Sequence, residues 1–375
     1  MTLSVVLAGG GSTGHVAPLL ALADCLRRRD PDTRITALGT AEGLEARLVP
    51  AAGYPLATVP KVPLPRRPSG DVVRLPTRLR AAIVAASAAL RQNRADVLVG
   101  FGGYVSTPAY LAARRAGIPV VVHEQNARPG LANRVGARVT SFVGVTFPDT
   151  PLRGARLVGM PLRRQITGLD RAALREQARA GFGLDADRVT LLVTGGSLGA
   201  QRLNETLGAS AGALAEAGVQ VLHVAGRGKD VPLGGPAAAA GRGVPYVVHE
   251  YLDQIGLAYA AADLVVCRAG AGTVCEVTTV GLPAAYVPLA IGNGEQRWNA
   301  QPVVDAGGGL MVDNADCTPQ WVRQVLVPLL SDPNRLETMA KSAAVFGIRD
   351  GDERLADLVL EAAGAPVVDS EEDAL

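Results

Sequence analysis

Short apolar runs alternate with longer segments of helical periodicity along almost the whole chain. The runs are rich in Val, Leu, Ile and Ala and do not alternate with polar residues, which is typical of strands buried on both faces of a parallel sheet. We therefore predict an α/β protein. Its first half has expected strands at residues 3–8, 35–38, 97–99, 120–122 and 157–158. Its second half has expected strands at residues 190–194, 219–224, 244–248, 264–267 and 284–287.

The two halves repeat one plan. Strands 3–8 and 190–194 each run into a glycine loop, and segments 95–99 and 262–266 each lead through a second glycine loop and a helix to the next strand. This pattern predicts two Rossmann-like domains whose parallel sheets face each other across a cleft. The first comprises residues 1–160 with the last helix, about 350–364, and the second comprises residues 161–349 around a hinge at 159–164. Residues 365–375 are expected to be a disordered acidic tail.

The composition of the chain argues against several classes of protein function. The net charge of +2 gives no field that would attract nucleic acid, so no nucleic-acid partner is expected. The four cysteines have no C-x-x-C spacing and are expected to be reduced thiols. The first residues lack the pattern of a signal peptide, and no apolar run is long enough to span a bilayer.

Residues 9–14 form a G-x-G-x-x-G loop between a strand and a helix, and Ser12, Thr13 and Gly14 lie in it. Backbone N–H groups of such a loop approach oxygen-rich ligands. A dinucleotide site also needs an acid at the end of the second strand, where this chain has Gly39 and Thr40, so a nicotinamide cofactor is disfavoured. His15 follows the loop at a helix N-terminus, which should keep its imidazole neutral and able to accept a proton.

Two further polar segments follow strands of the first half. Residues 102–106 are a second glycine loop that contains Tyr104 and Ser106, and residues 123–126 end in Asn126. Such dense donors and acceptors suit a sugar. The alternative is a hydrogen-bonded loop anchor, which fits Glu124 or Gln125 better than Asn126.

The second half offers sites for a nucleotide. Ser197 lies on a glycine loop, and residues 270–273 open a helix, so both segments can cradle a diphosphate. Glu276 lies one turn into that helix within reach of a ribose, and Arg163 can pair with a phosphate or be an exposed hinge charge. Both D-x-D segments, at 185–187 and 350–352, are interpreted as turn and helix-start residues, and no metal or other cofactor is predicted.

Residues 61–94 are strongly basic and contain a single acid, Asp71. Basic residues beside exposed apolar ones suit an anionic membrane surface. The alternative is an amphipathic helix at about 75–92 with its apolar face on the core, which leaves the Pro- and Arg-rich lead-in 61–76 as the better membrane candidate.

Taken in order, these motifs resemble the MurG family of bacterial transferases, which move N-acetylglucosamine (GlcNAc) from UDP to lipid I, undecaprenyl-diphosphoryl-N-acetylmuramyl-pentapeptide. The residues that carry the resemblance are 9–15, 102–106, 123–126, 195–200 and 267–270 with Thr273, Glu276, Gln296 and Asn299. The resemblance implies the GT-B fold and an inverting, metal-independent transfer to the 4-hydroxyl of N-acetylmuramic acid, which gives the β1,4-linked lipid II of peptidoglycan. It also implies a peripheral location on the cytoplasmic side of the cell membrane, with its anionic inner leaflet and other cell-wall synthesis proteins as candidate partners.

The resemblance also assigns roles. His15 is the implied catalytic base, and Tyr104, Ser106 and Asn126 are the implied acceptor side. Glu295 and Arg297 depart from members that carry Gln and an aromatic residue there. The implied donor-site residues, with the glycine-loop residues included, are Ser12, Thr13, Gly14, Asn126, Arg163, Ser197, Leu252 through its backbone, Thr273, Glu276 and Gln296.

Other functions within the same architecture stay open at this point. A UDP-GlcNAc 2-epimerase would need no lipid acceptor, and a diacylglycerol sugar transferase would ignore lipid I. A regulator that binds the nucleotide sugar without turnover is a third alternative, and a nicotinamide dehydrogenase is the weakest. The basic stretch 61–94 favours a lipid acceptor over the epimerase.

Overall fold

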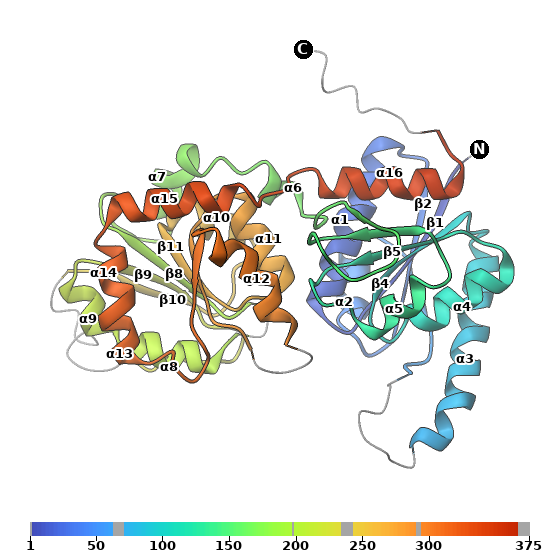
Figure 1. The fold of residues 1–375 in the computed structure, drawn as a ribbon, viewed down its shortest axis with the longest axis horizontal. Coiled ribbons are helices and arrows are strands. Elements are labelled where there is room, and N and C mark those ends of the chain that lie inside the picture. The colour runs from blue at the N-terminus through green and yellow to red at the C-terminus, as the bar shows by residue number, and fades with distance from the viewer. Residues whose placement is uncertain (1, 63–70, 197–198, 234–242, 290–293, 367–375) are drawn as a thin grey trace. The chain divides into compact units, whose positions relative to one another are not determined.

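The computed structural model describes residues 2–62, 71–196, 199–233, 243–289 and 294–366, apart from the side chains of 71–74. The chain divides into two compact units, Met1–Arg163 together with Asp350–Leu375, and Arg164–Arg349 (Figure 1). The boundary expected from the sequence lies at residues 160 and 161, a few residues before the observed division.

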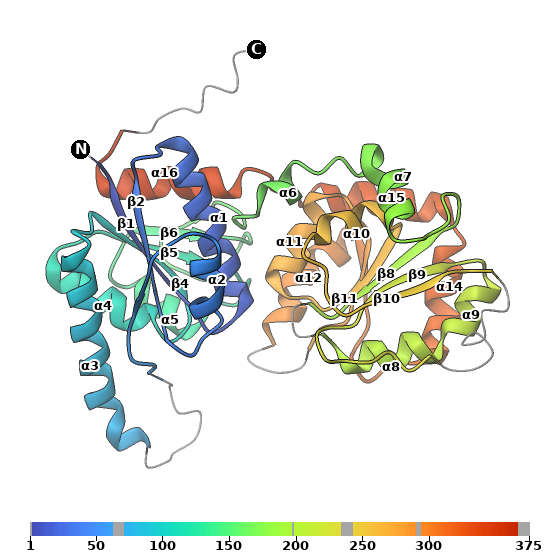
Figure 2. The same ribbon diagram turned by 180° about the vertical axis from the view of Figure 1, so that it is seen from behind.

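The first unit is built on a parallel sheet with the strand order β3-β2-β1-β4-β5-β6-β7. Helices α1 and α16 cover one face, and α3 and α4 cover the other (Figure 2). The strands are β1 (Ser4–Gly9), β2 (Arg34–Gly39), β3 (Leu56–Thr58), β4 (Val97–Gly102), β5 (Val120–Glu124), β6 (Phe142–Val145) and β7 (Ala155–Leu157). The helices are α1 (Thr13–Arg29), α2 (Glu45–Ala51), α3 (Asp71–Gln92), α4 (Ser106–Ala116), α5 (Leu131–Gly136) and α16 (Gly351–Ala363).

Burial on both faces explains why β1 reads as an unbroken apolar run. Val5 and Leu7 pack in the core beneath α1 and α16, whereas Val6 and Ala8 pack in the core beneath α3 and α4. Successive side chains of a strand point to opposite faces, so a strand covered on both sides must be apolar at every position.

The second unit repeats this architecture with the parallel order β10-β9-β8-β11-β12-β13. Its strands are β8 (Thr190–Thr194), β9 (Gln220–Val224), β10 (Tyr246–His249), β11 (Leu264–Cys267), β12 (Ala284–Tyr286) and β13 (Gly309–Met311). Its helices are α6 (Arg164–Thr167), α7 (Arg171–Gly181), α8 (Gln201–Ala209), α9 (Ala211–Glu216), α10 (Ile255–Ala261), α11 (Ala271–Thr279), α12 (Glu295–Asp305), α13 (Pro319–Trp321), a π-helical turn Val322–Leu326, α14 (Val327–Leu330) and α15 (Pro333–Ala344).

The last helix returns to the first unit. Leu355 and Val359 of α16 are fully buried against α1 and the sheet. On the rim of this contact Arg28 pairs with Asp352 at 3.0 Å, and Arg29 pairs with Glu353. Helix α16 thus completes the core of a unit whose other elements lie at the opposite end of the chain.

Several sequence predictions need correction. Strands β3, β6 and β13 were not predicted, because each has only three or four residues and no distinct apolar run. Strand β7 ends at Leu157, where a strand at 157–158 was expected. Helix α3 begins at Asp71 instead of about 75, so the end of the proposed lead-in 61–76 is helical, and residues 63–70 lie outside the described residues.

The contact of α16 with the first unit can be tested by the substitution Leu355→Ala. Loss of a fully buried leucine should lower the free energy of unfolding of this unit by about 2–5 kcal/mol. Denaturant unfolding would measure the loss. The control is Val84→Ala on α3, where a side chain that is 61% exposed should change stability by no more than about 0.5 kcal/mol. Equal effects of the two substitutions would contradict the packing described here.

Candidate functional site

The carboxyl ends of three neighbouring strands bring the polar segments of the first unit together. Strands β1, β4 and β5 are adjacent in the sheet. His15 lies in the first turn of α1 after β1, and Tyr104 and Asn126 lie in the loops that follow β4 and β5. Ligands of open α/β sheets bind at this edge. The order of the strands therefore gathers residues that the sequence places far apart.

The two glycine loops of the first unit touch through their backbones. A Cβ atom on Gly103 would lie 2.4 Å from the carbonyl oxygen of Gly10, and a Cβ atom on Gly102 would lie 3.2 Å from Nε2 of His15. Gly102 and Gly103 have φ angles of 94° and 82°, in the left-handed region. Glycine is needed at both positions because any side chain would strain the backbone and separate the loops.

His15 is held in one tautomer by this arrangement. Its Nδ1 lies 3.1 Å from the carbonyl oxygen of Gly10 and 3.0 Å from Oγ of Ser12. A carbonyl oxygen only accepts, so Nδ1 carries the proton and Nε2 keeps its lone pair. Burial lowers the pKa of His15, and the bond to Gly10 and the charge of Glu45 oppose this shift only in part. The imidazole is therefore neutral at pH 7, with its basic nitrogen toward Gly102.

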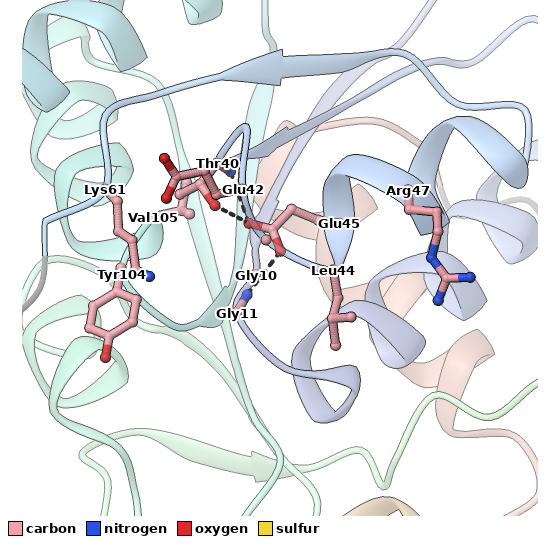
Figure 3. Close-up of a pocket in the computed structure, with 11 residues that line it drawn as sticks. Gly10, Gly11, Thr40, Glu42, Leu44, Glu45, Arg47, Lys61, Tyr104 and Val105 are labelled. Atoms are coloured by element: carbon pink, nitrogen blue, oxygen red, sulfur yellow. Dashed lines mark hydrogen bonds between the residues drawn. The ribbon is translucent and has the colours of Figure 1, made fainter. Parts of the chain in front are cut away.

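A carboxylate absent from the sequence prediction lies behind the loop. Glu45 is fully buried; its Oε2 accepts from the N–H of Gly11 at 2.9 Å, and its Oε1 accepts from the N–H and the hydroxyl of Thr40 at 2.9 and 2.8 Å (Figure 3). Burial alone would raise the pKa of Glu45, but these hydrogen bonds outweigh it and the pKa is lowered. Glu45 is thus an ionised group that joins the end of β2 to the first glycine loop.

Glu45 forms one wall of a pocket of about 290 Å³. Figure 3 shows Tyr104 and Lys61 together in this pocket. Tyr104 is 40% exposed, and the ammonium nitrogen of Lys61 lies 5.6 Å from the centroid of its ring. Of the residues expected to contact the acceptor, Tyr104 is the exposed aromatic side chain in this pocket.

Glu124 anchors the loop that follows β5. Its Oε1 accepts from the N–H of Asn126 at 2.9 Å, and its Oε2 accepts from the N–H of Gly130 and from Nδ2 of Asn133 at 2.9 and 3.0 Å. Burial raises the pKa of Glu124, and the hydrogen bonds offset this shift in part. The interpretation of Glu124 as a loop anchor is confirmed, and Asn126 is left half-buried at the surface of that loop.

Two other polar side chains of these segments also belong to the framework. Burial lowers the pKa of His123 to about 4, and its Nε2 donates to the carbonyl of Gly159 at 2.9 Å. Ser106 is fully buried, and its Oγ lies 3.0 Å from the carbonyl of Ala8 and 2.8 Å from that of Gly102. This position gives no support to the expected acceptor contact of Ser106, because its hydroxyl ties β4 to β1.

The expected donor residues of the second unit also follow its strands. Thr273 and Glu276 lie on α11 after β11, and Oε2 of Glu276 accepts from the hydroxyl of Tyr259 at 2.8 Å. Gln296 lies on α12 after β12 and accepts from the N–H of Leu289 at 2.9 Å, which fixes its side chain. Leu252 follows β10.

Two other residues expected to bind the donor do not belong to this described set in the second unit. Arg163 is exposed at the end of the first unit's main segment. Ser197 lies outside the described residues. The described candidate residues therefore form two sets, one in each unit, and their roles in binding are proposals.

A metal site receives little support from the described residues. One group of three possible ligands, Cys25, Asp352 and Glu353, occurs among them. Both carboxylates pair with arginines, and burial together with the two acids raises the pKa of the Cys25 thiol. A protonated thiol and arginine-paired carboxylates are poor metal ligands. We assign this cluster to the packing of α16 against α1.

The D-x-D segments are local structure, as predicted. Oδ1 of Asp185 accepts from the N–H groups of Asp187 and Arg188 in a turn, and Asp350 precedes the first residue of α16. Sequence reasoning missed Glu45, Asn133 and Tyr259, which support the site from behind. Only Glu45 has a sequence signal, as an acid shortly after a strand that ends in glycine.

The state of His15 gives a direct test by NMR. Its titration midpoint should lie below the ordinary value of 6.5, and its neutral form should carry the proton on Nδ1. Long-range ¹H–¹⁵N spectra of the imidazole rings between pH 4 and 9 would report both properties, and His15→Gln would assign the resonance. A midpoint at or above 6.5, or a proton on Nε2, would contradict the geometry.

Comparison with known proteins places the chain in a family. Residues 5–144 match the glycosyltransferase family 28 N-terminal domain, and residues 190–355 match the family's C-terminal domain. The chain is 60% identical to a protein of Nocardioides sp., over 96% of this chain and 98% of that protein. It is 56% identical to a protein of Streptomyces coelicolor, over 97% and 99%. Both relatives are named UDP-N-acetylglucosamine–N-acetylmuramyl-(pentapeptide) pyrophosphoryl-undecaprenol N-acetylglucosamine transferase.

Solved structures agree with this result. The crystal structure of Acinetobacter baumannii MurG superposes with a TM-score of 0.77 at 29% identity, over 96% of this chain and all of that one. A UDP-GlcNAc 2-epimerase of Neisseria meningitidis has a TM-score of 0.67 at 14% identity, over 96% of this chain and all of that one, which shows a shared fold alone. The predicted fold class is confirmed as two Rossmann-like units of the GT-B type. The chain belongs to the family 28 glycosyltransferases, within the MurG family of N-acetylglucosamine transferases.

Proposed function

We propose that the protein transfers GlcNAc from UDP-GlcNAc to the 4-hydroxyl of the N-acetylmuramyl residue of lipid I, with His15 as the general base. The observation that carries the proposal is the neutral imidazole of His15, whose Nε2 keeps its lone pair where two glycine loops meet. A base with a pKa below neutral pH is unprotonated under working conditions and ready to accept a proton. The names of the relatives supply the substrates.

The transfer is a direct displacement. The acceptor hydroxyl attacks the anomeric carbon of GlcNAc while the bond from that carbon to UDP breaks, and the electron pair leaves on the UDP oxygen. The hydroxyl proton moves to Nε2 of His15. Inversion at the anomeric carbon converts the α linkage of the donor into the β1,4 linkage of lipid II.

The proposed donor residues lie in both units, and the proposed acceptor residues lie in the first. Glu276, held by Tyr259, is oriented to accept from ribose hydroxyls, and Gln296 is fixed beside the loop after β12 to bind hydroxyls of GlcNAc. The N-terminus of α11, with Thr273 in its first turn, stabilises charge on the departing diphosphate, as Arg163 does. Ser12, Thr13, Gly14 and Asn126 are the proposed donor residues of the first unit besides Arg163, and Tyr104 and Asn126 are its proposed acceptor residues.

An assay of UDP release tests the reaction. With UDP-GlcNAc, a lipid I analogue and EDTA, UDP should appear only when the acceptor is present, and the product should be a β-linked disaccharide. His15→Ala should lower kcat by about 10²–10⁴-fold because the base is removed. Release without an acceptor would favour an epimerase, and release only with diacylglycerol would favour the other lipid transferase. Either result would overturn the proposal, as would full activity of His15→Ala.

Peripheral binding to anionic lipid through α3 is the second part of the proposal. Within the described residues, no helix has the length and apolar character needed to cross a bilayer. Arg80, Val84, Ala88 and Arg91 recur at helical spacing on α3 and are all exposed, with Val84 61% exposed. An exposed stripe of cations around an apolar residue fits an anionic surface.

Vesicle co-sedimentation tests this surface. Wild-type protein should bind vesicles with 30 mol% anionic lipid and lose affinity as salt rises. Arg80→Glu with Arg91→Glu should weaken binding by about tenfold or more, because each cation contributes about 1 kcal/mol near such a surface. The matched control reverses Arg323 and Arg335, which are exposed on the second unit. Equal losses in the two double variants would rule out α3 as the contact.

A further inference from the structure

One peptide group links Glu45 to His15. The N–H of Gly11 donates to Oε2 of Glu45 at 2.9 Å, and the carbonyl of Gly10 accepts from Nδ1 of His15 at 3.1 Å. These two groups belong to the same peptide bond. A trans peptide points its N–H and C=O in opposite directions, so the carboxylate and the imidazole lie on opposite sides of the loop. Their connection is a relay of two hydrogen bonds through a planar, polarisable unit.

We infer that Glu45 is the positioning residue of this relay, which sets the tautomer, orientation and basicity of His15 through the Gly10–Gly11 peptide. The inference rests on the proposed role of His15 as the base. Hydrogen bonds in a chain polarise one another, so a carboxylate on the N–H makes the carbonyl at the other end a stronger acceptor. That carbonyl then favours the proton on Nδ1 and stabilises the imidazolium after Nε2 has taken the acceptor's proton.

The residues around Glu45 leave space for its side chain and supply hydrogen-bond donors to both carboxylate oxygens. A Cβ atom on Gly10, Gly39 or Gly43 would lie 2.4, 2.4 or 2.1 Å from atoms of the Glu45 side chain. Three glycines thus make room for one buried acid. Thr40 supplies a backbone and a hydroxyl donor to Oε1, which leaves Oε2 for Gly11. The lowered pKa of Glu45 agrees with a group that stays ionised throughout turnover.

Other groups around His15 do not replace this charge. Ser12 on the loop and Asn133 on α5 are neutral, and Asn133 donates to Glu124. Tyr104 lies beside Gly11 and is paired with Lys61 on the pocket side. Among the charged side chains that the structure describes around His15, Glu45 is the one whose field raises the pKa of His15 against the effect of burial.

During the reaction no proton crosses the peptide. The acceptor's proton is added to Nε2, the proton on Nδ1 stays in its bond to Gly10, and Glu45 remains a carboxylate. The imidazolium then loses the Nε2 proton to solvent, which restores the starting state. Glu45 acts only by orientation and charge and does not touch a substrate.

The variant Glu45→Gln tests the relay because it keeps the shape of the side chain and removes its charge. The pKa of His15 should fall by about one unit. The acid limb of the pH profile of kcat/KM should move to lower pH by the same amount, while kcat falls by about 10–100-fold. Glu45→Asp keeps the charge, so the pKa of His15 should fall less in this variant than in Glu45→Gln. The control is Glu361→Gln, an exposed carboxylate of the same unit that pairs with Arg156, and it should change neither quantity.

A purely structural role predicts a different result, namely lower kcat with an unmoved acid limb and an unmoved NMR midpoint of His15. That result would overturn the inference. If His15→Ala remains active while Glu45→Gln still shifts the pKa of His15, the relay stands and the proposed role of His15 as the base fails. The two failures are therefore distinguishable.

A measurement on the unaltered protein covers the case in which Glu45→Gln does not fold. The ¹³C resonance of the Glu45 carboxylate should show a second titration step at the midpoint of His15, since protonation of the ring is transmitted through the Gly10–Gly11 peptide. The Glu361 carboxylate should show no such step. Absence of the step at Glu45, or its presence at both carboxylates, would refute the relay.

Discussion

The close approach of backbones at the carboxyl ends of β1 and β4 is the constraint on which the candidate site of the first unit depends. Gly103 lies against the carbonyl of Gly10, and the same loop receives the carboxylate of Glu45 on its other side. No side chain could stand at Gly10 or Gly103 without pushing one of these groups away. The glycines of the first motif thus serve two purposes, since they leave backbone groups open to a ligand and admit a buried acid that fixes the loop.

Some buried polar residues of the first unit hold its loops in place by hydrogen bonds, whereas others are candidates for a direct part in the reaction. Glu124, His123 and Ser106 have their polar atoms bonded within the protein, and each joins one strand end to another loop. His15 differs, because within the described residues only its Nδ1 is held by hydrogen bonds of this kind. The hydrogen-bonded side chains fix the geometry of the loops. Nε2 of His15 is the basic atom that keeps its lone pair in the described structure, and it can therefore accept a proton.

The sequence predicted the parallel sheets well, because strands buried on both faces, such as β1 and β8, appear as unbroken apolar runs. It could not show β3 or β13, which are short and partly exposed. It also could not separate Ser106 from Tyr104 within one motif. The difference depends on where α4 begins, since that places the Ser106 hydroxyl beneath the loop and leaves the Tyr104 ring at the surface. The motifs predicted which loops lie at the candidate site, and the accessibility of each side chain in those loops depends on the fold.

Glu45 also bears on the choice between a nucleotide-sugar enzyme and a dinucleotide enzyme. A dinucleotide site places an acid at the end of the second strand, with its oxygens toward the ribose. Here β2 ends in Gly39, and two acids follow it. Glu42 is exposed, whereas Glu45 is turned inward, with one oxygen on Thr40 and the other on Gly11. A carboxylate whose oxygens both accept from the protein, and which has no exposed surface, cannot bind ribose hydroxyls as well. The residue that supports His15 is therefore unavailable to a ribose, and the end of β2 itself, at Gly39 and Thr40, supplies no acid for a dinucleotide.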